Sequence, residues 1–170
     1  KKLSAMILAA GFGKRLNPLT NNIPKPLIRI DGKPLLQNTI DLLFHLNCDE
    51  IIINTHFKHN LINKFIMNNY KNKNILLSYE KNILDTAGGV KNASSLFTKK
   101  VALIVNSDIF WTRENIKDLK FLIKDFKYKD ECKVLLSSRE KSHGMYKKKG
   151  DFVISNGLIK RYQNTQKILF

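Results

Sequence analysis

Residues 6–27 read MILAAGFGKRLNPLTNNIPKPL, and this stretch decides the expected fold. The run Met6–Ala10 is continuously apolar, which is typical of a parallel strand buried on both faces of a sheet. The segment Gly11-Phe12-Gly13 follows directly, and glycine lets the backbone turn tightly and a ligand approach closely. Backbone N–H groups of such a turn, and of the helix that it opens, are donors for phosphate. We therefore expect a phosphate site here.

Three cations in the same stretch, Lys14, Arg15 and Lys25, supply charged donors for phosphate. All four prolines of the chain lie between Pro18 and Pro34, and two of them flank Lys25. A residue that precedes proline is pushed toward extended backbone geometry. We therefore expect Lys25 on a stiff, extended segment that holds its charge in place.

Two better-known phosphate loops do not fit this stretch. A dinucleotide fingerprint needs a third glycine where Leu16 stands. A P-loop needs four residues between its glycines and then Lys-Ser or Lys-Thr, which is absent here. The alternative is that Gly11 and Gly13 only turn the chain, with Lys14 and Arg15 solvated. The glycine spacing together with the proline-flanked lysine favours the phosphate site.

Length and composition are those of a single globular domain over residues 1–170, with 43% hydrophobic and 26% charged residues. No apolar run reaches membrane-spanning length and the N-terminus has no long apolar secretion signal, so we expect a cytoplasmic protein without a membrane partner. Cys48 and Cys132 form no CxxC pattern, which argues against a zinc site and a disulfide framework. The histidines form no spaced metal cluster; they are His45, His56, His59 and His143.

The formal net charge of +16 raises the possibility of a nucleic-acid-binding protein, because clustered Lys and Arg neutralise phosphates. Here the basic residues are spread along the chain and most are lysine. The tight cluster at residues 147–149 lacks the interleaved aromatic residues of an RNA platform. A basic nucleic-acid-binding module therefore stays a distant alternative. The charge is expected to attract anionic substrates instead.

Strand and helix patterns alternate along the rest of the chain. Apolar runs predict strands at 50–54, 75–79, 101–105 and 134–136, and helical spacing predicts helices at 34–46, 61–66, 86–97 and 112–126. Thr86 and Thr112 are expected to cap the last two helices, and Asn156-Gly157 is a hairpin signal. The alternation predicts an α/β protein, a Rossmann-like three-layer αβα domain with a mainly parallel sheet.

Ligands of open α/β sheets bind beyond the carboxyl ends of the strands. The segment Gly11–Arg15 follows the first strand, and Asp108 follows the strand at 101–105, so both should face one crevice. A carboxylate opposite a phosphate loop can hold Mg²⁺ together with phosphate oxygens. The alternative role for Asp108 is a helix cap or a loop hydrogen bond; its expected place across from the cations favours the metal.

A second glycine-bearing segment, Asp85-Thr86-Ala87-Gly88-Gly89, follows the strand at 75–79. Glycine in a helix costs about 1 kcal/mol relative to alanine, so two in a row indicate close packing against something flat or bulky. A nucleobase or a ribose is the candidate, and a simple tight turn is the alternative.

These motifs together resemble the sugar-1-phosphate nucleotidyltransferases, and the resemblance covers nearly the whole chain. Residues 8–27 look like the family's signature, Thr86–Gly89 like its nucleoside-contacting loop, and Val105–Asp108 like its metal-binding turn. The small single-domain N-acetylmuramate-1-phosphate uridylyltransferases and mannose-1-phosphate guanylyltransferases look most similar, partly through His143-Gly144 and Gly150–Phe152. The resemblance implies the fold of the nucleotide-diphospho-sugar transferases.

The activity that the resemblance implies is transfer of a nucleoside monophosphate from a nucleoside triphosphate to a sugar 1-phosphate. Pyrophosphate leaves, and the product is a nucleotide-sugar for the cell envelope, made from UTP or GTP and a hexose or amino-sugar 1-phosphate. By matching position, the catalytic residues would be Arg15 on the triphosphate and Lys25 on the α-phosphate, with Asp108 on Mg²⁺. The implied nucleotide-binding residues are Ala9, Ala10, Gly11, Gly13, Lys14, Thr86 and Gly88, and the implied sugar-binding residues are Gly150 and Asp151.

The chain departs from the family pattern at its end. The family carries a second metal-binding aspartate, usually in an Asp-Val-Gly-like turn, beyond the region that aligns here. This sequence stops at residues 168–170, in what reads as the middle of a strand, so we expect a domain truncated at its C-terminal part. A fragment would regain activity when downstream residues are restored. The alternative is a catalytically incomplete remnant that binds nucleotide without turnover.

Overall fold

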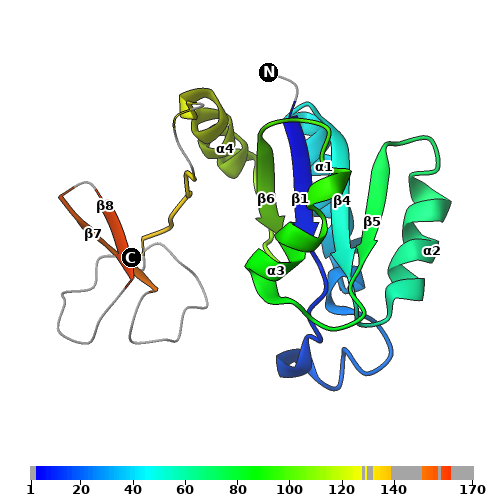
Figure 1. Cartoon of the computed structure of the whole chain (residues 1–170). Helices are drawn as coiled ribbons and strands as arrows, with labels where there is room; N and C mark the ends of the chain where they lie inside the picture. Colours follow the sequence, from blue (N-terminus) through cyan, green and yellow to red (C-terminus); the bar gives the residue numbers. More distant parts are fainter. Residues whose placement is uncertain (1–2, 128, 130–131, 139–150, 157, 162–170) are drawn as a thin grey trace. The chain divides into compact units, whose positions relative to one another are not determined.

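Four parallel strands form the sheet that organises the N-terminal part of the chain (Figure 1). Their order is β5-β4-β1-β6, with β1 at Leu3–Leu8, β4 at Cys48–Thr55, β5 at Ile75–Tyr79 and β6 at Ala102–Asn106. Strands β1 and β4 lie in the middle and are buried along almost their whole length, because both of their faces are covered. The predictions of a mainly parallel sheet and of a buried first strand are therefore confirmed.

The computed structural model describes residues 3–127, 129, 132–138, 151–156 and 158–161. It separates into two units, Lys1–Lys117 and Asp118–Phe170. The four-stranded sheet belongs to the first unit. The single domain expected over residues 1–170 stays a prediction.

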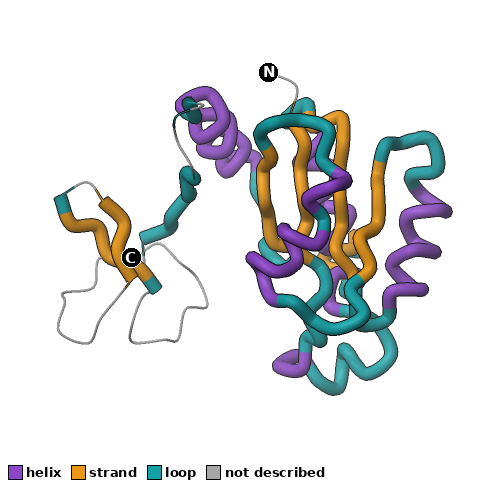
Figure 2. Tube along the Cα trace, viewed as in Figure 1, coloured by secondary structure: helices purple, strands orange, loops and turns teal. Residues whose placement is uncertain are grey.

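One face of the sheet is covered by α3 (Asp85–Asn92) and the short 3-10 helix η3 (Ser94–Leu96). Met6 pairs in register with Ile52 on one side and Ile104 on the other, and Met6 and Ile52 are fully buried in one apolar cluster with Ala93. Figure 1 shows α3 in front of the sheet and α1 behind it, and Figure 2 separates the helices from the strands by colour. The helix–sheet–helix layering matches the predicted αβα arrangement.

The opposite face is covered by α1 (Leu35–His45), which packs against β4. Leu36, Ile40 and Leu43 recur at helical spacing and are fully buried. Helix α2 (His59–Asn69) packs beside β5 and buries Ile62 and Ile66. These helices confirm the helical patterns predicted at 34–46 and 61–66.

Two short 3-10 helices, η1 (Lys14–Leu16) and η2 (Lys25–Leu27), carry the cations that follow β1. Lys25 begins η2, so the extended geometry predicted for it is wrong. The reason is that Pro26 takes the second position of η2, where its missing N–H breaks no helical bond. Backbone bonds from Leu27 N to the Pro24 oxygen (2.8 Å) and from Ile28 N to the Lys25 oxygen (3.1 Å) still stiffen the segment.

A small antiparallel pair, β2 (Arg29–Ile30) and β3 (Lys33–Pro34), follows η2. Its turn residues, Asp31 and Gly32, have positive φ angles of 50° and 76°.

Three local predictions differ from the structure. Strand β1 ends at Leu8 rather than Ala10, because Ala9 N leaves the ladder and donates to Asn54 Oδ1 at 2.7 Å. Thr86 does not cap α3, which begins at Asp85 and has no side-chain cap. No strand occurs within residues 132–138, so the strand predicted at 134–136 is wrong; the apolar run finds no partner strand there and stays largely exposed.

The second unit contains a hairpin of β7 (Phe152–Ser155) and β8 (Leu158–Arg161), which confirms the hairpin predicted around Asn156-Gly157. Helix α4 (Arg113–Asp125) runs across the division between the units. Thr112 Oγ1 and Thr112 N both donate to Asn115 Oδ1 at 3.0 Å at the start of α4. His143, the lysines at 147–149, Gly150 and the strand expected after the hairpin lie outside the described residues.

Both cysteines are free, with Cys48 buried and Cys132 exposed. Within the described residues, no group of three His, Cys, Asp or Glu side chains could hold a metal ion. None of the described helices combines the length and the apolar character needed to cross a membrane.

Glu50 is a buried carboxylate near the amino end of β4, 3% exposed. Ser4 Oγ donates to its Oε1, and Thr98 donates to it through N (3.0 Å) and Oγ1 (2.6 Å). Burial by itself would raise the pKa of Glu50, but the hydrogen bonds from Ser4 and Thr98, together with the positive charge of Lys99, outweigh it and lower the pKa. The carboxylate therefore joins β1, β4 and the segment before β6.

Glu50→Gln should lower the free energy of unfolding at pH 7 by about 1–2 kcal/mol, because the amide has only one acceptor oxygen for three donors. A pKa that is lower in the folded state stabilises the fold above the unfolded-state pKa, and this contribution is lost as the pH falls through the folded-state pKa. Urea unfolding at pH 7, 5 and 3 should show the difference between the two proteins shrinking toward acid. A difference that stays constant would contradict this role of Glu50.

Candidate functional site

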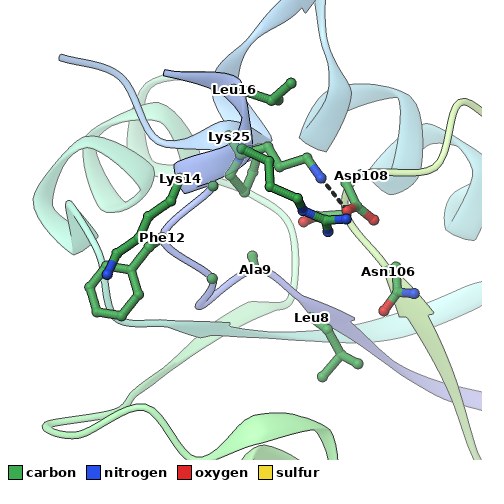
Figure 3. A pocket seen from close by; sticks show the side chains of 13 residues that line it. Leu8, Ala9, Phe12, Lys14, Leu16, Lys25, Asn106 and Asp108 are labelled. Atoms are coloured by element: carbon green, nitrogen blue, oxygen red, sulfur yellow. Dashed lines mark hydrogen bonds and ion pairs between the residues drawn. The ribbon is translucent and has the colours of Figure 1, made fainter. Parts of the chain in front are cut away.

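A cavity of about 380 Å³ opens beyond the carboxyl ends of β1 and β6 (Figure 3). The residues that line it are Leu8, Ala9, Gly11, Phe12, Gly13, Lys14, Arg15, Leu16, Lys25, Pro26, Asn106, Ser107 and Asp108. Parallel neighbouring strands end at the same edge of a sheet, so the segments after β1 and β6 meet there. The predicted crevice between Gly11–Arg15 and Asp108 is therefore present.

The turn after β1 depends on a glycine at position 13. Gly13 has a φ of 68°, and a Cβ there would lie 3.0 Å from both Lys25 Cβ and Thr20 Cγ2. Thr20 Oγ1 also donates to the Gly13 oxygen at 3.1 Å. Gly11 differs, since a Cβ at that position would meet nothing within 4 Å. Gly13 is thus needed by the fold, whereas Gly11 leaves open space in the cavity.

Lys25 lines the cavity, and its Nζ forms an ion pair with the Asp108 carboxylate (Figure 3). Both side chains stay partly exposed to the cavity, at 24% for Lys25 and 37% for Asp108. Lys14 instead lies over the Phe12 ring, with its Nζ 5.1 Å from the ring centroid. Arg15 also lines the cavity.

Charge in the cavity favours an anion. Three lining residues, Lys14, Arg15 and Lys25, are cationic, and Asp108 is the acidic one among them. Cations that converge in a concave site attract phosphate groups and supply charge-assisted hydrogen bonds.

Oxygen ligands for a cation come from the end of β6. The carboxylate of Asp108 and the carboxamide of Asn106 both line the cavity, and oxygen atoms are the ligands that Mg²⁺ prefers. Mg²⁺ commonly completes its coordination with substrate phosphate oxygens and water rather than with a full protein cage. The donor set therefore fits Mg²⁺ that arrives with a phosphate ligand.

A second cavity of about 180 Å³ adjoins the first and shares Leu8, Gly11 and Asn106 with it. Its other lining residues are Ala10, Asn54, Glu80, Ile83, Asp85 and Thr86. The three shared residues show that the two cavities are neighbours at the carboxyl ends of the strands.

The glycine pair in α3 makes room for side chains of the chain itself. A Cβ on Gly89 would lie 2.7 Å from Glu80 Oε1 and 2.8 Å from Asn54 Nδ2, and one on Gly88 would lie 2.9 Å from Leu84 Cβ. The close packing expected from the two glycines is therefore present, against these side chains. Contact of Gly88 with a base stays a prediction, because Gly88 does not line the second cavity.

Most of the predicted site residues line one of the two cavities; these are Ala9, Ala10, Gly11, Gly13, Lys14, Arg15, Lys25, Thr86 and Asp108. Asp151 is exposed in the second unit, and Gly150 is outside the described residues. The sequence patterns assigned no role to Asn54 and Glu80, and Asn106 appeared only as a member of the turn at Val105–Asp108. Each of these residues is a polar residue at the end of an apolar run that predicts a strand. That feature could have found them, but the local pattern alone gives such a residue no role.

Comparison with known proteins identifies one family over most of the chain. Residues 4–156 match the family model described as nucleotidyl transferase. The chain is 35% identical over 106 residues to a D-glycero-alpha-D-manno-heptose 1-phosphate guanylyltransferase of Aneurinibacillus thermoaerophilus, covering 62% of this chain and 46% of that protein. It is 30% identical over 162 residues to an N-acetylmuramate alpha-1-phosphate uridylyltransferase of Caulobacter vibrioides, covering 92% of this chain and 66% of that protein.

Solved structures share the fold. HddC from Yersinia pseudotuberculosis complexed with GMP-PN is 26% identical with a TM-score of 0.56, over 68% of this chain and 53% of that one. An inositol-1-phosphate CTP transferase from T. maritima is 18% identical with a TM-score of 0.62, over 69% of this chain and 48% of that one, which supports the fold alone. The chain thus spans about half to two thirds of the length of these relatives.

Gly13→Ala should lower the free energy of unfolding by about 1–3 kcal/mol, because a Cβ in the left-handed region is strained and also meets Lys25 and Thr20. Gly11→Ala is the matched control, two residues away in the same turn, and should change stability by less than about 1 kcal/mol. Urea unfolding of the two variants measures the difference. Equal effects of the two substitutions would contradict this account of the turn.

Proposed function

This chain belongs to the nucleotidyl transferase family, and from that premise we propose that it transfers a nucleoside monophosphate from a nucleoside triphosphate to a sugar 1-phosphate. The observation that carries the proposal is the Lys25–Asp108 pair, which faces the glycine turn in a cationic cavity. The adjoining second cavity leaves room for the nucleoside.

In the proposed reaction, a phosphate oxygen of the sugar 1-phosphate attacks the α-phosphorus of the triphosphate. A new P–O bond forms, and the bond from the α-phosphorus to the bridging oxygen breaks. Pyrophosphate leaves with that electron pair, and the product is a nucleotide-sugar. Such a displacement needs positioning and electrostatic stabilisation rather than a covalent enzyme intermediate.

The chain's own cations serve this displacement. Lys25 would bind the α-phosphate, because its stiff 3-10 helix holds the ammonium over the cavity. Arg15 would bind the outer phosphates and the charge that develops on pyrophosphate, since guanidinium donors match phosphate geometry. Backbone N–H groups of the Gly11–Gly13 turn would add neutral donors.

Asp108 would hold Mg²⁺ together with phosphate oxygens, with Asn106 beside it. When bound, Mg²⁺ would neutralise phosphate charge and make the α-phosphorus more electrophilic. Asp108 already faces a cation, the Lys25 ammonium, which supports a role for it in holding positive charge. As a phosphate arrives, Lys25 would exchange its partner from Asp108 to the α-phosphate.

The proposed substrates are UTP or GTP with a hexose or amino-sugar 1-phosphate. Similarity to one guanylyltransferase and one uridylyltransferase of sugar 1-phosphates supports this class. We further propose a cytoplasmic reaction whose nucleotide-sugar product is used in building the cell envelope.

Arg15→Ala and Lys25→Ala should each lower the rate of pyrophosphate release by about 10²–10³, the usual effect of removing one preorganised donor to a transition state. Their thermal unfolding without nucleotide should change little, because Arg15 is exposed and Lys25 is partly exposed. Lys64→Ala, which removes an exposed lysine of α2, is the charge-matched control and should keep full activity.

The assay combines pyrophosphate release from sugar 1-phosphates with thermal unfolding in each of the four nucleoside triphosphates and Mg²⁺. A selective rise in Tm identifies the base, because ligand binding stabilises the folded state by mass action. Pyrophosphate release that is unchanged in both variants would contradict the assigned roles. A Tm shift without any pyrophosphate release would instead support the nucleotide-binding remnant.

A further inference from the structure

Two buried polar side chains that line the second cavity have no part in the proposed chemistry. Asn54, near the end of β4, is 3% exposed, and Glu80, directly after β5, is 1% exposed. Both still line the second cavity. Among the described residues Glu80 forms no ion pair, so burying its carboxyl group is costly unless hydrogen bonds satisfy it.

The hydrogen bonds of the pair run from one cavity to the other. Ala9 N, at the start of the turn that lines the first cavity, donates to Asn54 Oδ1 at 2.7 Å. Asn54 Nδ2 donates to Glu80 Oε1 at 2.8 Å, and Leu84 N donates to Glu80 Oε2 at 3.1 Å. One continuous chain of hydrogen bonds therefore joins the turn after β1 to residues 81–86, the segment that borders the second cavity.

His56 adds a parallel connection between the same two regions. Its Nδ1 lies 2.8 Å from the Glu80 carbonyl oxygen, which can only accept, so the ring nitrogen donates. The same ring packs edge-on against Phe12, with centroids 5.3 Å apart. Phe12 lines the first cavity, so this contact also reaches the turn after β1.

Helix α3 closes over the pair at Gly89. A Cβ at that position would lie 2.7 Å from Glu80 Oε1 and 2.8 Å from Asn54 Nδ2. The backbone of α3 can approach this closely only because residue 89 is glycine. The pair therefore fixes three elements of the site: the turn after β1, the 81–86 segment and the first turns of α3.

We propose that Asn54 and Glu80 are positioning residues, which hold the turn after β1 and the 81–86 segment at the separation that one nucleoside triphosphate needs to fill both cavities. This inference rests on the proposed function, because it takes the nucleotide as the ligand. It assigns these side chains no contact with the reacting atoms. Their effect is on ligands that span the two cavities.

Glu80→Gln tests the proposal with almost no change of shape. The carboxylate offers an acceptor to each of two donors, Asn54 Nδ2 and Leu84 N. A carboxamide has one acceptor and one NH₂ group, so one of these donors must face another donor. The chain of hydrogen bonds is then broken at one point while the volume of the side chain is kept.

Glu50→Gln is the matched control. Glu50 is also a buried glutamate that accepts hydrogen bonds from neutral donors, but it lies near the amino end of β4, away from both cavities. A substitution that acts through stability alone should have the same effect at both positions.

Calorimetry on the full 170-residue chain in Mg²⁺ would compare two ligands for each protein. One is whichever of ATP, GTP, CTP and UTP binds the unsubstituted chain most tightly, and the other is inorganic tripolyphosphate, which has no ribose or base to place in the second cavity. Glu80→Gln should raise the Kd of the nucleotide about tenfold, the size of one lost buried hydrogen bond, and change that of tripolyphosphate less than about threefold. Glu50→Gln should change neither by more than about twofold.

Equal losses for both ligands in Glu80→Gln, or equal nucleotide losses in the two glutamine variants, would overturn the positioning role. An unsubstituted chain that binds no nucleotide more tightly than tripolyphosphate would instead overturn the proposed function, and with it this inference. Circular dichroism at the temperature of the titrations confirms that each variant is folded.

Gly89→Ala is a second test that removes no polar group. Its Cβ would push against Glu80 and Asn54, whereas alanine is a better helix former than glycine, so the helix itself is not weakened. It should weaken nucleotide binding about tenfold and spare tripolyphosphate, as Glu80→Gln does. If the Glu80→Gln variant does not fold, the Gly89→Ala variant is the test of the proposal. An unchanged Kd of the Gly89→Ala variant for the nucleotide would then overturn it.

Discussion

The ion pair between Lys25 and Asp108 is the interaction on which the site depends. The two residues are 83 positions apart in the sequence and meet because β1 and β6 are parallel neighbours that end at the same edge of the sheet. Gly13, with a φ of 68°, lets the turn after β1 pack closely against the Cβ of Lys25. The position of the charges therefore depends on the fold: the parallel strands β1 and β6 end at one edge of the sheet, and the segment after β1 carries Lys25 to that edge.

Two buried glutamates show how differently the same side chain is used along one sheet. Glu50, near the amino end of β4, joins strands and contributes to stability, and its lowered pKa reflects the hydrogen bonds that it accepts. Glu80, after the carboxyl end of β5, accepts from Asn54 and from the backbone beside the second cavity. Ligands of parallel sheets bind at the carboxyl ends of the strands, so a polar group buried there can position a ligand while one at the other end cannot.

Sequence patterns predicted the features that rest on local rules. Continuous apolar runs located the four strands of the sheet. Because ligands of such sheets bind beyond the carboxyl ends of the strands, Asp108 was correctly predicted to lie near the glycine turn. The 3-10 conformation of Lys25 was missed for a local reason, since Pro26 fits the second position of a 3-10 helix as well as it follows an extended residue. The contacts of Asn54 with Glu80 were missed, because the two residues are 26 positions apart and meet only in the folded sheet. The strand predicted at 134–136 failed for the same reason, since an apolar run becomes a strand only where a partner strand is present.

The most direct test of the account is a crystal structure of the chain with a non-hydrolysable nucleoside triphosphate and Mg²⁺. The account predicts phosphates over the Gly11–Gly13 turn, the base beside Thr86 in the second cavity, and Lys25 Nζ on the α-phosphate with the metal on Asp108. A nucleotide bound elsewhere, with the Lys25–Asp108 ion pair unchanged, would contradict it.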